Sequence, residues 1–192
     1  IEGIETSPTS DQMKHFGAAM ASWGSTPLFH IVGITPECAD LGSVNAQGLY
    51  AEKIAQSDLN DLRSGFGQPG DTVDVVVFAA PQLSLVEMQA LSKLCSGLTF
   101  SVPVIVCTSP QVYPDAMRMG LIDVIQNAGG KVLQGTCFYQ QYAREIGEAN
   151  GWKRLLSNSA KIVNILGGYG YAPALASMEV CVQSAVKGEI TR

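Results

Sequence analysis

The chain has 192 residues, of which 46% are hydrophobic and 15% are charged, and its formal net charge is −5 at pH 7. This composition is typical of a well-buried globular chain and excludes a disordered one. The acidic balance, without a basic run, argues against nucleic acid or an anionic membrane as a partner, and no apolar run reaches the ~18 residues of a membrane span.

The N-terminal third begins with a clear helix signal. Thr9 and Gln12 stand in the spacing of a capping box, and apolar residues then recur at helical spacing as far as Trp23. We expect a helix that ends at Gly24, a strand at Leu28–Val32, a loop over residues 39–48, and a short helix within Lys53–Arg63.

Residues 72–97 read as a strand, a tight turn and a capped helix. Asp74–Ala80 is apolar after its first residue and rich in β-branched residues, which predicts a strand covered on both faces, as in a parallel sheet. Pro81–Gln82 is expected to end this strand. Ser84 and Glu87 then have the spacing of a capping box at the start of the helix.

The remaining sequence continues this alternation of strands and helices. We expect strands at Val102–Cys107, Lys131–Gly135 and Ile162–Leu166, helices at Ser109–Met119, 121–128 and Ala174–Lys187, and a mixed segment at Tyr139–Trp152. The alternation predicts an α/β fold of three layers, with a mainly parallel sheet and helices on both faces. We expect residues 1–192 to form one domain.

The cysteines favour a reducing compartment. All five are far apart and none belongs to a C-x-x-C pair, which fits reduced thiols better than a disulfide framework. Cys95, Cys107 and Cys181 fall within predicted helices or strands and should be core residues, whereas Cys38 lies at a turn. No secretion signal opens the chain, so we expect a cytoplasmic protein, and the start at Ile1 suggests a piece of a longer one.

Polar residues follow the predicted strands and should meet at the carboxyl edge of the sheet, where open α/β sheets hold their sites. Hydroxyls, a thiol and glycines gathered there could bind a small acidic substrate. The residues expected on this rim are Thr35–Glu37, Ala80–Gln82, Thr108, Ser109, Thr136, Cys137 and Gly167–Gly170.

Each candidate also has a purely structural interpretation. Thr108 and Ser109 could only cap the following helix. Cys137 could bind a metal or a cluster as a thiolate, or could be a small core residue. His30 lies in an apolar run, which favours a core histidine over a catalytic base. The glycine cluster Gly167–Gly170 could cradle a phosphate or form a plain turn.

The residues just before the last predicted strand have two interpretations as well. Ser159 and Lys161 could grip a carboxylate through a hydroxyl and an ammonium group, or they could face solvent.

Phe29–Glu37 resembles the H-x-V-G-x-T-P-E signature of aconitase X large subunits. Further stretches agree in the same order along the whole chain: Ser7–Thr9 before a helix rich in Gly and Ala, Thr108–Ser109, Thr136–Cys137, Ser157–Lys161, and Glu179–Gly188. On these motifs the chain is similar to the C-terminal half of that large subunit.

This resemblance implies an activity and partners. The family comprises dehydratases (hydro-lyases) of the aconitase superfamily; bacterial members act on cis-3-hydroxy-L-proline and archaeal members on mevalonate 5-phosphate. We expect the C-terminal domain of a hydro-lyase for a small hydroxy acid, with cis-3-hydroxy-L-proline as the first choice. The alternatives are a mevalonate 5-phosphate dehydratase and a degenerate domain that serves as an assembly or binding module. The implied partners are the N-terminal half of the large subunit and a small swivelling domain or subunit, so the isolated chain should be inactive.

The resemblance also implies roles for individual residues. Cys137 would bind the metal, Ser159 and Lys161 would bind the substrate carboxylate, and Thr108 and Ser109 would line the pocket. The base, which would remove the proton α to the carboxylate, is not among these residues.

The family holds an iron–sulfur centre with cysteines of its large subunit, and such a Lewis acid would assist the departure of hydroxide. Where the family usually carries Gly-Cys-Pro-His, this chain has Ala79–Gln82, so Ala80 replaces a presumed ligand cysteine. An iron–sulfur cluster or iron in the full-length enzyme would therefore have an altered ligand set, and the isolated chain is expected to bind none.

Overall fold

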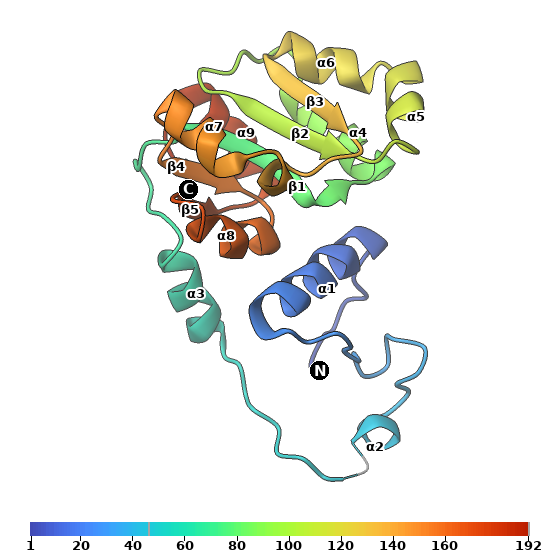
Figure 1. Cartoon of the computed structure of the whole chain (residues 1–192). Coiled ribbons are helices and arrows are strands. Elements are labelled where there is room, and N and C mark those ends of the chain that lie inside the picture. Colours follow the sequence, from blue (N-terminus) through green and yellow to red (C-terminus); the bar gives the residue numbers. More distant parts are fainter. Residues whose placement is uncertain (46, 192) are drawn as a thin grey trace.

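The protein is described from a computed structural model that covers residues 1–45 and 47–191. Its centre is an all-parallel sheet in the order β3-β2-β1-β4-β5 (Figure 1). The strands are β1 (Val75–Leu83), β2 (Val104–Thr108), β3 (Gly130–Gln134), β4 (Arg154–Ser157) and β5 (Ala172–Leu175). The chain builds outward from β1 to β3 and then returns to the other side of β1 for β4 and β5. The order therefore reverses between β1 and β4, the point at which open α/β sheets leave a crevice for ligands.

Helices cover both faces of this sheet. One face carries α4 (Leu85–Cys95), α5 (Tyr113–Arg118), α6 (Leu121–Asn127) and α9 (Met178–Lys187). The other carries the 3-10 turn η1 (Phe138–Gln140), α7 (Ala143–Asn150) and α8 (Ala160–Gly167). The predicted three-layer α/β fold with a parallel sheet is thus confirmed.

Strand β1 explains why its sequence is apolar throughout. Val76 and Phe78 pack in the core beneath α4, α6 and α9, whereas Val75 and Val77 pack in the core beneath η1, α7 and α8. All four side chains are fully buried, because successive residues of a strand point to opposite faces and helices cover both. The strand does not stop at Pro81–Gln82 as expected. It continues to Leu83, with an irregular register against β2.

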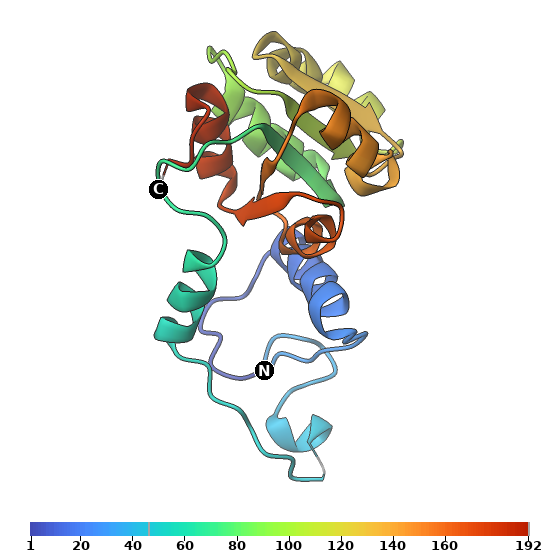
Figure 2. The same ribbon diagram turned by 60° about the vertical axis from the view of Figure 1, so that its left-hand side comes forward.

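The N-terminal region contains α1 (Ser10–Gly24), α2 (Leu41–Val44) and α3 (Gln56–Ser64), and in both views it lies below the sheet layers (Figures 1 and 2). The capping box predicted at the start of α1 is present. The predicted loop at residues 39–48 contains α2, and its residue 46 lies outside the described residues. From residue 48 to the start of α3 the chain has no helix or strand and exposes large apolar side chains, among them Leu49 (69%) and Tyr50 (94%).

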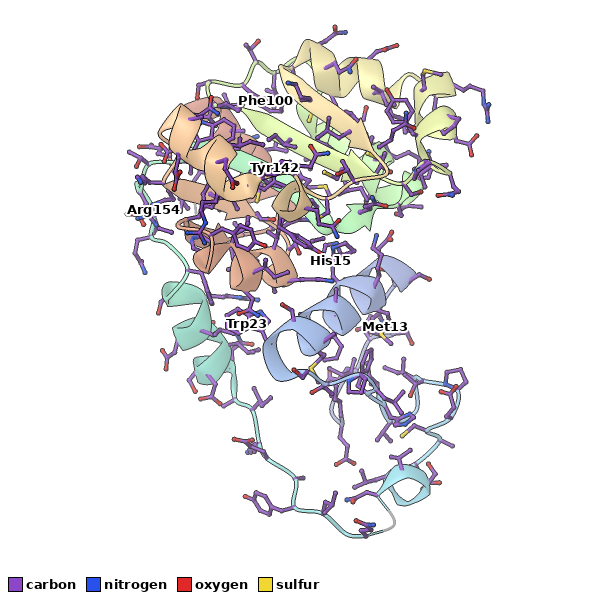
Figure 3. All side chains as sticks on the ribbon, in the orientation of Figure 1. Met13, His15, Trp23, Phe100, Tyr142 and Arg154 are labelled. Atoms are coloured by element: carbon purple, nitrogen blue, oxygen red, sulfur yellow. The ribbon has the colours of Figure 1, made fainter. Side chains whose placement is uncertain are left out.

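Helix α1 is fastened to the sheet domain at both of its ends. Near its C-terminus, the indole N–H of Trp23 donates to the carbonyl of Ala160 at 2.9 Å, and the amide of Asn164 donates to the carbonyl of Ser22 at 2.8 Å. Near its N-terminus, Lys14 and His15 reach the sheet side, as described below. In Figure 3 the labelled Trp23 and His15 mark these two attachments. Within the described residues, no helix combines the length and apolarity that a membrane crossing requires.

Two predicted strands are wrong. Leu28–Val32 forms no strand and belongs to the irregular chain after α1. Ile162–Leu166 lies inside α8, where Ile162, Val163 and Leu166 bury one side of a helix. A short apolar run fits a buried strand and a buried helix equally well, because periodicity does not separate them over five residues. The strands on either side of α8, which are β4 and β5, were not predicted, and the last helix starts later than expected because β5 occupies its predicted first turn.

Candidate active site

The carboxyl ends of β1 and β4 are joined by serine hydroxyls. Ser157 donates to the carbonyl of Val77 at 2.7 Å, and Ser159 donates to the carbonyl of Ala80. Ser159 is also the N-cap of α8, since its oxygen accepts from the N–H of Ile162 at 3.3 Å. Ser159 as a whole is only 1% exposed. These bonds fix the backbone where the strand order reverses, and they place the start of α8 on the rim.

Thr108 and Ser109 also lie on this rim, at the end of β2. The fully buried hydroxyl of Thr108 donates to the carbonyl of Leu83 at 2.7 Å, so it ties the end of β2 to the end of β1. The oxygen of Ser109 accepts from the N–H of Val112 at 3.2 Å and caps a turn that precedes α5. Both hydroxyls are engaged within the protein, and the helix starts later than its predicted N-cap.

Cys137 follows β3 and faces the end of β1. It is 8% exposed, and burial raises the pKa of its thiol, while the backbone N–H groups of Tyr139, Phe138 and Ala80 and the charge of Lys161 act in the opposite direction. Burial prevails, so the sulfur is a protonated thiol at neutral pH. The structure thus brings Cys137, Ala80 and Lys161 together from three different elements.

The thiols around this rim do not form a ligand set for an iron–sulfur cluster. Cys107 lies in β2 in the same buried cluster, where burial and the neighbouring Cys137 raise its pKa to about 12. Ala80 offers a methyl group where a second rim thiolate would be needed, and a cluster requires several thiolates. Cys38 is buried in the N-terminal region, with its sulfur 3.6 Å from the carbonyl oxygen of Asp40. Among residues 1–45 and 47–191, no group of three or more His, Cys, Asp or Glu side chains could hold a metal ion.

Gln82, at the end of β1, braces the loop after β3. Its amide donates to the carbonyl of Thr136 at 2.9 Å, while the hydroxyl of Thr136 accepts from Gln141 at 2.7 Å. The side chain of Gln82 therefore holds the segment that carries Cys137 against the end of β1.

Two predicted members of the rim lie elsewhere. Thr35 closes a turn in the N-terminal region, where its hydroxyl accepts from the N–H of Ile31 at 3.0 Å, because no strand precedes it. Gly167–Gly170 spans the end of α8 and leads into the start of β5. It therefore lies at the amino edge of the sheet, opposite the rim, and the error follows from the strand wrongly predicted over α8.

His30 keeps its Nδ1 buried without a hydrogen-bond partner in the described part of the chain.

Sequence reasoning missed a charged cluster that covers the start of α4. Glu87 accepts from the N–H of Ser84 at 2.8 Å, from the ring of His15 at 2.8 Å, and from the ammonium of Lys14. Lys14 also donates to the carbonyl of Gln82 at 3.1 Å. Burial would raise the pKa of Glu87, but the hydrogen bonds from His15, Lys14 and Ser84 and the charge of Lys14 outweigh it and lower the pKa to about 2. The capping box located Glu87, whereas nothing in the local sequence pointed to partners more than seventy residues away.

Two family models match consecutive parts of the chain. A family model described as the aconitase X second domain matches residues 1–64, and one described as the aconitase X third domain matches residues 73–187. The first range holds α1, α2 and α3, and the second holds the sheet and the helices that cover it.

Similar proteins are known among characterised enzymes and solved structures. The chain is 31% identical to a cis-3-hydroxy-L-proline dehydratase of Pseudomonas aeruginosa, over 98% of this chain and 33% of the relative. It is 30% identical to the phosphomevalonate dehydratase large subunit of Methanothermobacter thermautotrophicus, over 84% of this chain and 39% of the relative. The crystal structure of Thermococcus kodakaraensis aconitase X in its holo-form superposes with a TM-score of 0.77 at 21% identity, over 96% of this chain and 46% of the other. The chain thus spans between about a third and just under half of the length of each of these proteins.

Proposed function

The chain belongs to the aconitase X family, and from this premise we propose that it is the C-terminal part of a hydro-lyase that dehydrates a small hydroxy acid. The proposed substrate is cis-3-hydroxy-L-proline, which the similarity to the Pseudomonas dehydratase over nearly the whole chain favours. A second candidate is mevalonate 5-phosphate, supported by the similarity to the archaeal large subunit.

The observation that carries the proposal is the convergence of motif residues at the reversal of the strand order. The charge of Lys161 and the backbone N–H of Ala80 both act on the buried thiol of Cys137, and the hydroxyl of Ser159 donates to the carbonyl of Ala80. These residues come from the ends of three elements and are the ones that the sequence motifs single out. A crevice at such a point is where parallel α/β sheets bind substrates.

Lys161 is the proposed partner of the substrate carboxylate. Elimination of water removes the proton α to this carboxylate, and negative charge then develops on the carboxylate oxygens. A fixed ammonium group stabilises that charge more in the transition state than in the ground state. Thr108 and Ser159 would hold the backbone of the pocket through their carbonyl bonds, and Ser109 would line it. We assign no step to a metal, because the rim offers one thiol, that of Cys137, and the base belongs to the rest of the enzyme.

The proposed partners are the N-terminal half of the large subunit and a small swivelling domain or subunit, and the proposed compartment is the cytoplasm. The whole enzyme, purified with its small domain, provides the test. Dehydration of cis-3-hydroxy-L-proline gives an enamine that tautomerises to a cyclic imine, which o-aminobenzaldehyde detects. We expect turnover of this substrate and none of mevalonate 5-phosphate. Turnover of the phosphate alone would favour the second candidate, and a folded enzyme inert toward both would favour a binding module.

A further inference from the structure

The N-terminal region exposes a continuous apolar segment, residues 48–62, which we call the apolar arm. Every residue from 47 to 65 is exposed. The large apolar side chains of the arm, which are between 41% and 94% exposed, are Leu49, Tyr50, Ile54, Leu59 and Leu62. In Figures 1 and 2 the chain between α2 and α3 runs apart from the other ribbons in both views. Single exposed apolar residues are common, but a gathered set of them marks an interaction surface.

Helix α3 carries part of this surface on one of its faces. Ala55, Leu59 and Leu62 stand at positions i, i+4 and i+7, which lie on the same face of an α-helix. The other positions from Gln56 to Ser64 are polar. A globular protein normally buries such a face in its core, yet α3 has no buried residue. An amphipathic helix with an uncovered apolar face has the form in which helices enter the grooves of partner proteins.

The arm has a defined conformation before any partner binds. At its start the N–H of Leu49 donates to Oδ1 of Asn45 at 2.8 Å, and the amide of Asn45 donates to the carbonyl of Leu49 at 3.1 Å. The carboxylate of Asp58 accepts from the N–H of Ala55 at 2.7 Å at the start of α3. A surface that is already ordered loses less conformational entropy on association, which favours binding.

The whole N-terminal region has little core of its own. Among its described residues up to 64, the buried apolar side chains are Ile31 and Cys38, and α1, α2 and α3 bury none. The sheet domain instead buries two large apolar clusters. Since residues 1–64 match one family domain, this domain must gain its buried surface from neighbours. The sheet domain supplies a neighbour for α1, whereas residues 48–55 lie at the end of the molecule remote from the sheet (Figures 1 and 2).

The family comparisons indicate which neighbour covers the arm. The two matching models are described as a second and a third domain, which implies that a first domain exists in the family. The chain covers 39% of the large subunit of Methanothermobacter thermautotrophicus, so more than half of that subunit lies outside the match. This part of a large subunit is a more direct candidate than a second copy of the chain or the small domain, because it belongs to the same polypeptide as the matched domains.

We propose that the apolar arm is a docking surface for the first domain of the large subunit, which covers it with an apolar groove. Leu59 and Leu62 enter this groove from α3, and Tyr50 and Ile54 continue the contact along the preceding chain. This inference deepens the proposed function, because it names the surface that joins the chain to one of its proposed partners, and it rests on that function for the identity of the partner.

Amide hydrogen exchange tests the occupant in three preparations: the 192-residue chain, the whole large subunit, and the large subunit with its small domain. Residues 48–55 form no helix or strand and should exchange rapidly in the chain alone. In the whole large subunit they should exchange at least about tenfold more slowly. Protection in the chain alone, together with a dimer in sedimentation, would identify a second copy as the occupant. Protection that requires the small domain would identify that domain. Either result would overturn the proposal, as would rapid exchange in all three preparations.

A double variant, Tyr50→Ser with Leu62→Gln, separates docking from a role in the fold of the chain itself. Because both side chains are exposed, the variant should leave the melting temperature of the 192-residue chain unchanged. In the whole large subunit it should lower the melting temperature by several degrees and restore rapid exchange at residues 48–55. The matched control is Val86→Gln, which replaces an exposed apolar residue of α4 and should change neither measurement. Unchanged melting and exchange in the double variant of the large subunit would also overturn the proposal.

These measurements do not depend on turnover, so the two proposals can fail separately. A protected arm in a folded enzyme that is inert toward both candidate substrates would support the docking surface and overturn the proposed function. Turnover by an enzyme whose arm still exchanges rapidly would overturn the docking surface and leave the function standing.

Discussion

The hydroxyl of Ser159 donates a hydrogen bond to the carbonyl of Ala80, a residue 79 positions earlier in the chain. This bond closes the carboxyl end of β1 onto the start of α8, and it does so at the point where the strand order reverses. A single side chain thereby caps a helix and holds the backbone at Ala80, the position that the sequence motifs align with a cysteine.

Replacing Ser159 by alanine should destabilise the protein by about 2–3 kcal/mol. The change removes an N-cap and leaves the buried carbonyl of Ala80 without its donor, and the two losses act together. Denaturant unfolding of the two proteins gives the difference. Ser177→Ala is the control, because Ser177 caps α9 through Val180 alone and should cost about 1 kcal/mol or less. Equal losses for the two variants would contradict the role given to the bond with Ala80.

Glu87 should make the stability depend on pH in the acid range. Its folded-state pKa is about 2, below the ordinary value of 4.5, so its stabilising contribution is fully present above pH 4.5 and is lost as the pH falls toward 2. A shift of this size corresponds to a contribution on the order of 3 kcal/mol. Unfolding midpoints measured from pH 6 to pH 2 should fall steeply in the natural protein and less steeply in Glu87→Gln. Glu145 is exposed, and among the described residues no such partners are seen for it. A Glu145→Gln protein with the same flattened profile would refute the assignment.

Restoring the thiol at position 80 should increase metal binding. The N–H of Ala80 points toward the sulfur of Cys137, so Ala80→Cys in the whole enzyme would put two thiols beside each other. Iron measured after anaerobic reconstitution should rise in Ala80→Cys and return to the starting level when Cys137→Ser is added. Ala128→Cys places a thiol in the core on the other face of the sheet and should bind no extra iron. If the iron content of the reconstituted Ala80→Cys enzyme does not rise, position 80 is not a ligand position.

Removing the charge of Lys161 should slow the proposed reaction. Loss of one fixed charge near a developing carboxylate charge typically costs about a hundredfold in rate, so Lys161→Met should lower kcat/KM by about that factor. Lys93→Met, at an exposed position near the end of α4, should leave kcat/KM unchanged. Full activity in Lys161→Met would remove this residue from the substrate site.

The thiol of Cys137 should react slowly in the folded protein. Burial raises its pKa, and the reactive thiolate is therefore scarce at neutral pH. All five cysteines are free and buried, so labelling with iodoacetamide at pH 7.5 should be slow in buffer and fast in denaturant. Rapid labelling of Cys137 in buffer, located by peptide mapping, would mean that its sulfur is more open or more acidic than described.

The elements that could be predicted from the sequence are those with two signals that agree. For α4, the capping box of Ser84 and Glu87 and the helical spacing of apolar residues coincide, and the helix lies where both place it. For β1, a β-branched run followed by turn residues gave the strand and the buried parallel sheet, and only its end was misplaced. Local sequence decides such elements because capping and burial both act within a few residues.

The rest depended on contacts between distant residues. β5 contains Pro173 and has only four residues, so its pairing with β4, and not its own propensity, makes it a strand. The error over α8 then moved Gly167–Gly170 to the wrong edge of the sheet. For the candidate site, the roles assigned from the sequence to Cys137, Ser159 and Lys161 stay predictions. The buried network around Glu87 could not be predicted, because it exists only through packing across the fold.

Helix α1 belongs to one matched family domain and is pinned at both ends to the other, through Trp23 at one end and Lys14 and His15 at the other. The boundary between residues 64 and 73 therefore separates two matched domains in the sequence, whereas in space the two parts are joined by these hydrogen bonds and ion pairs. If the chain were divided at this boundary, one polypeptide would carry Trp23, Lys14 and His15, and the other would carry the groups that they contact. Such fragments, expressed together, have the contacts to recognise one another and rebuild the covered end of the sheet without a peptide bond between them.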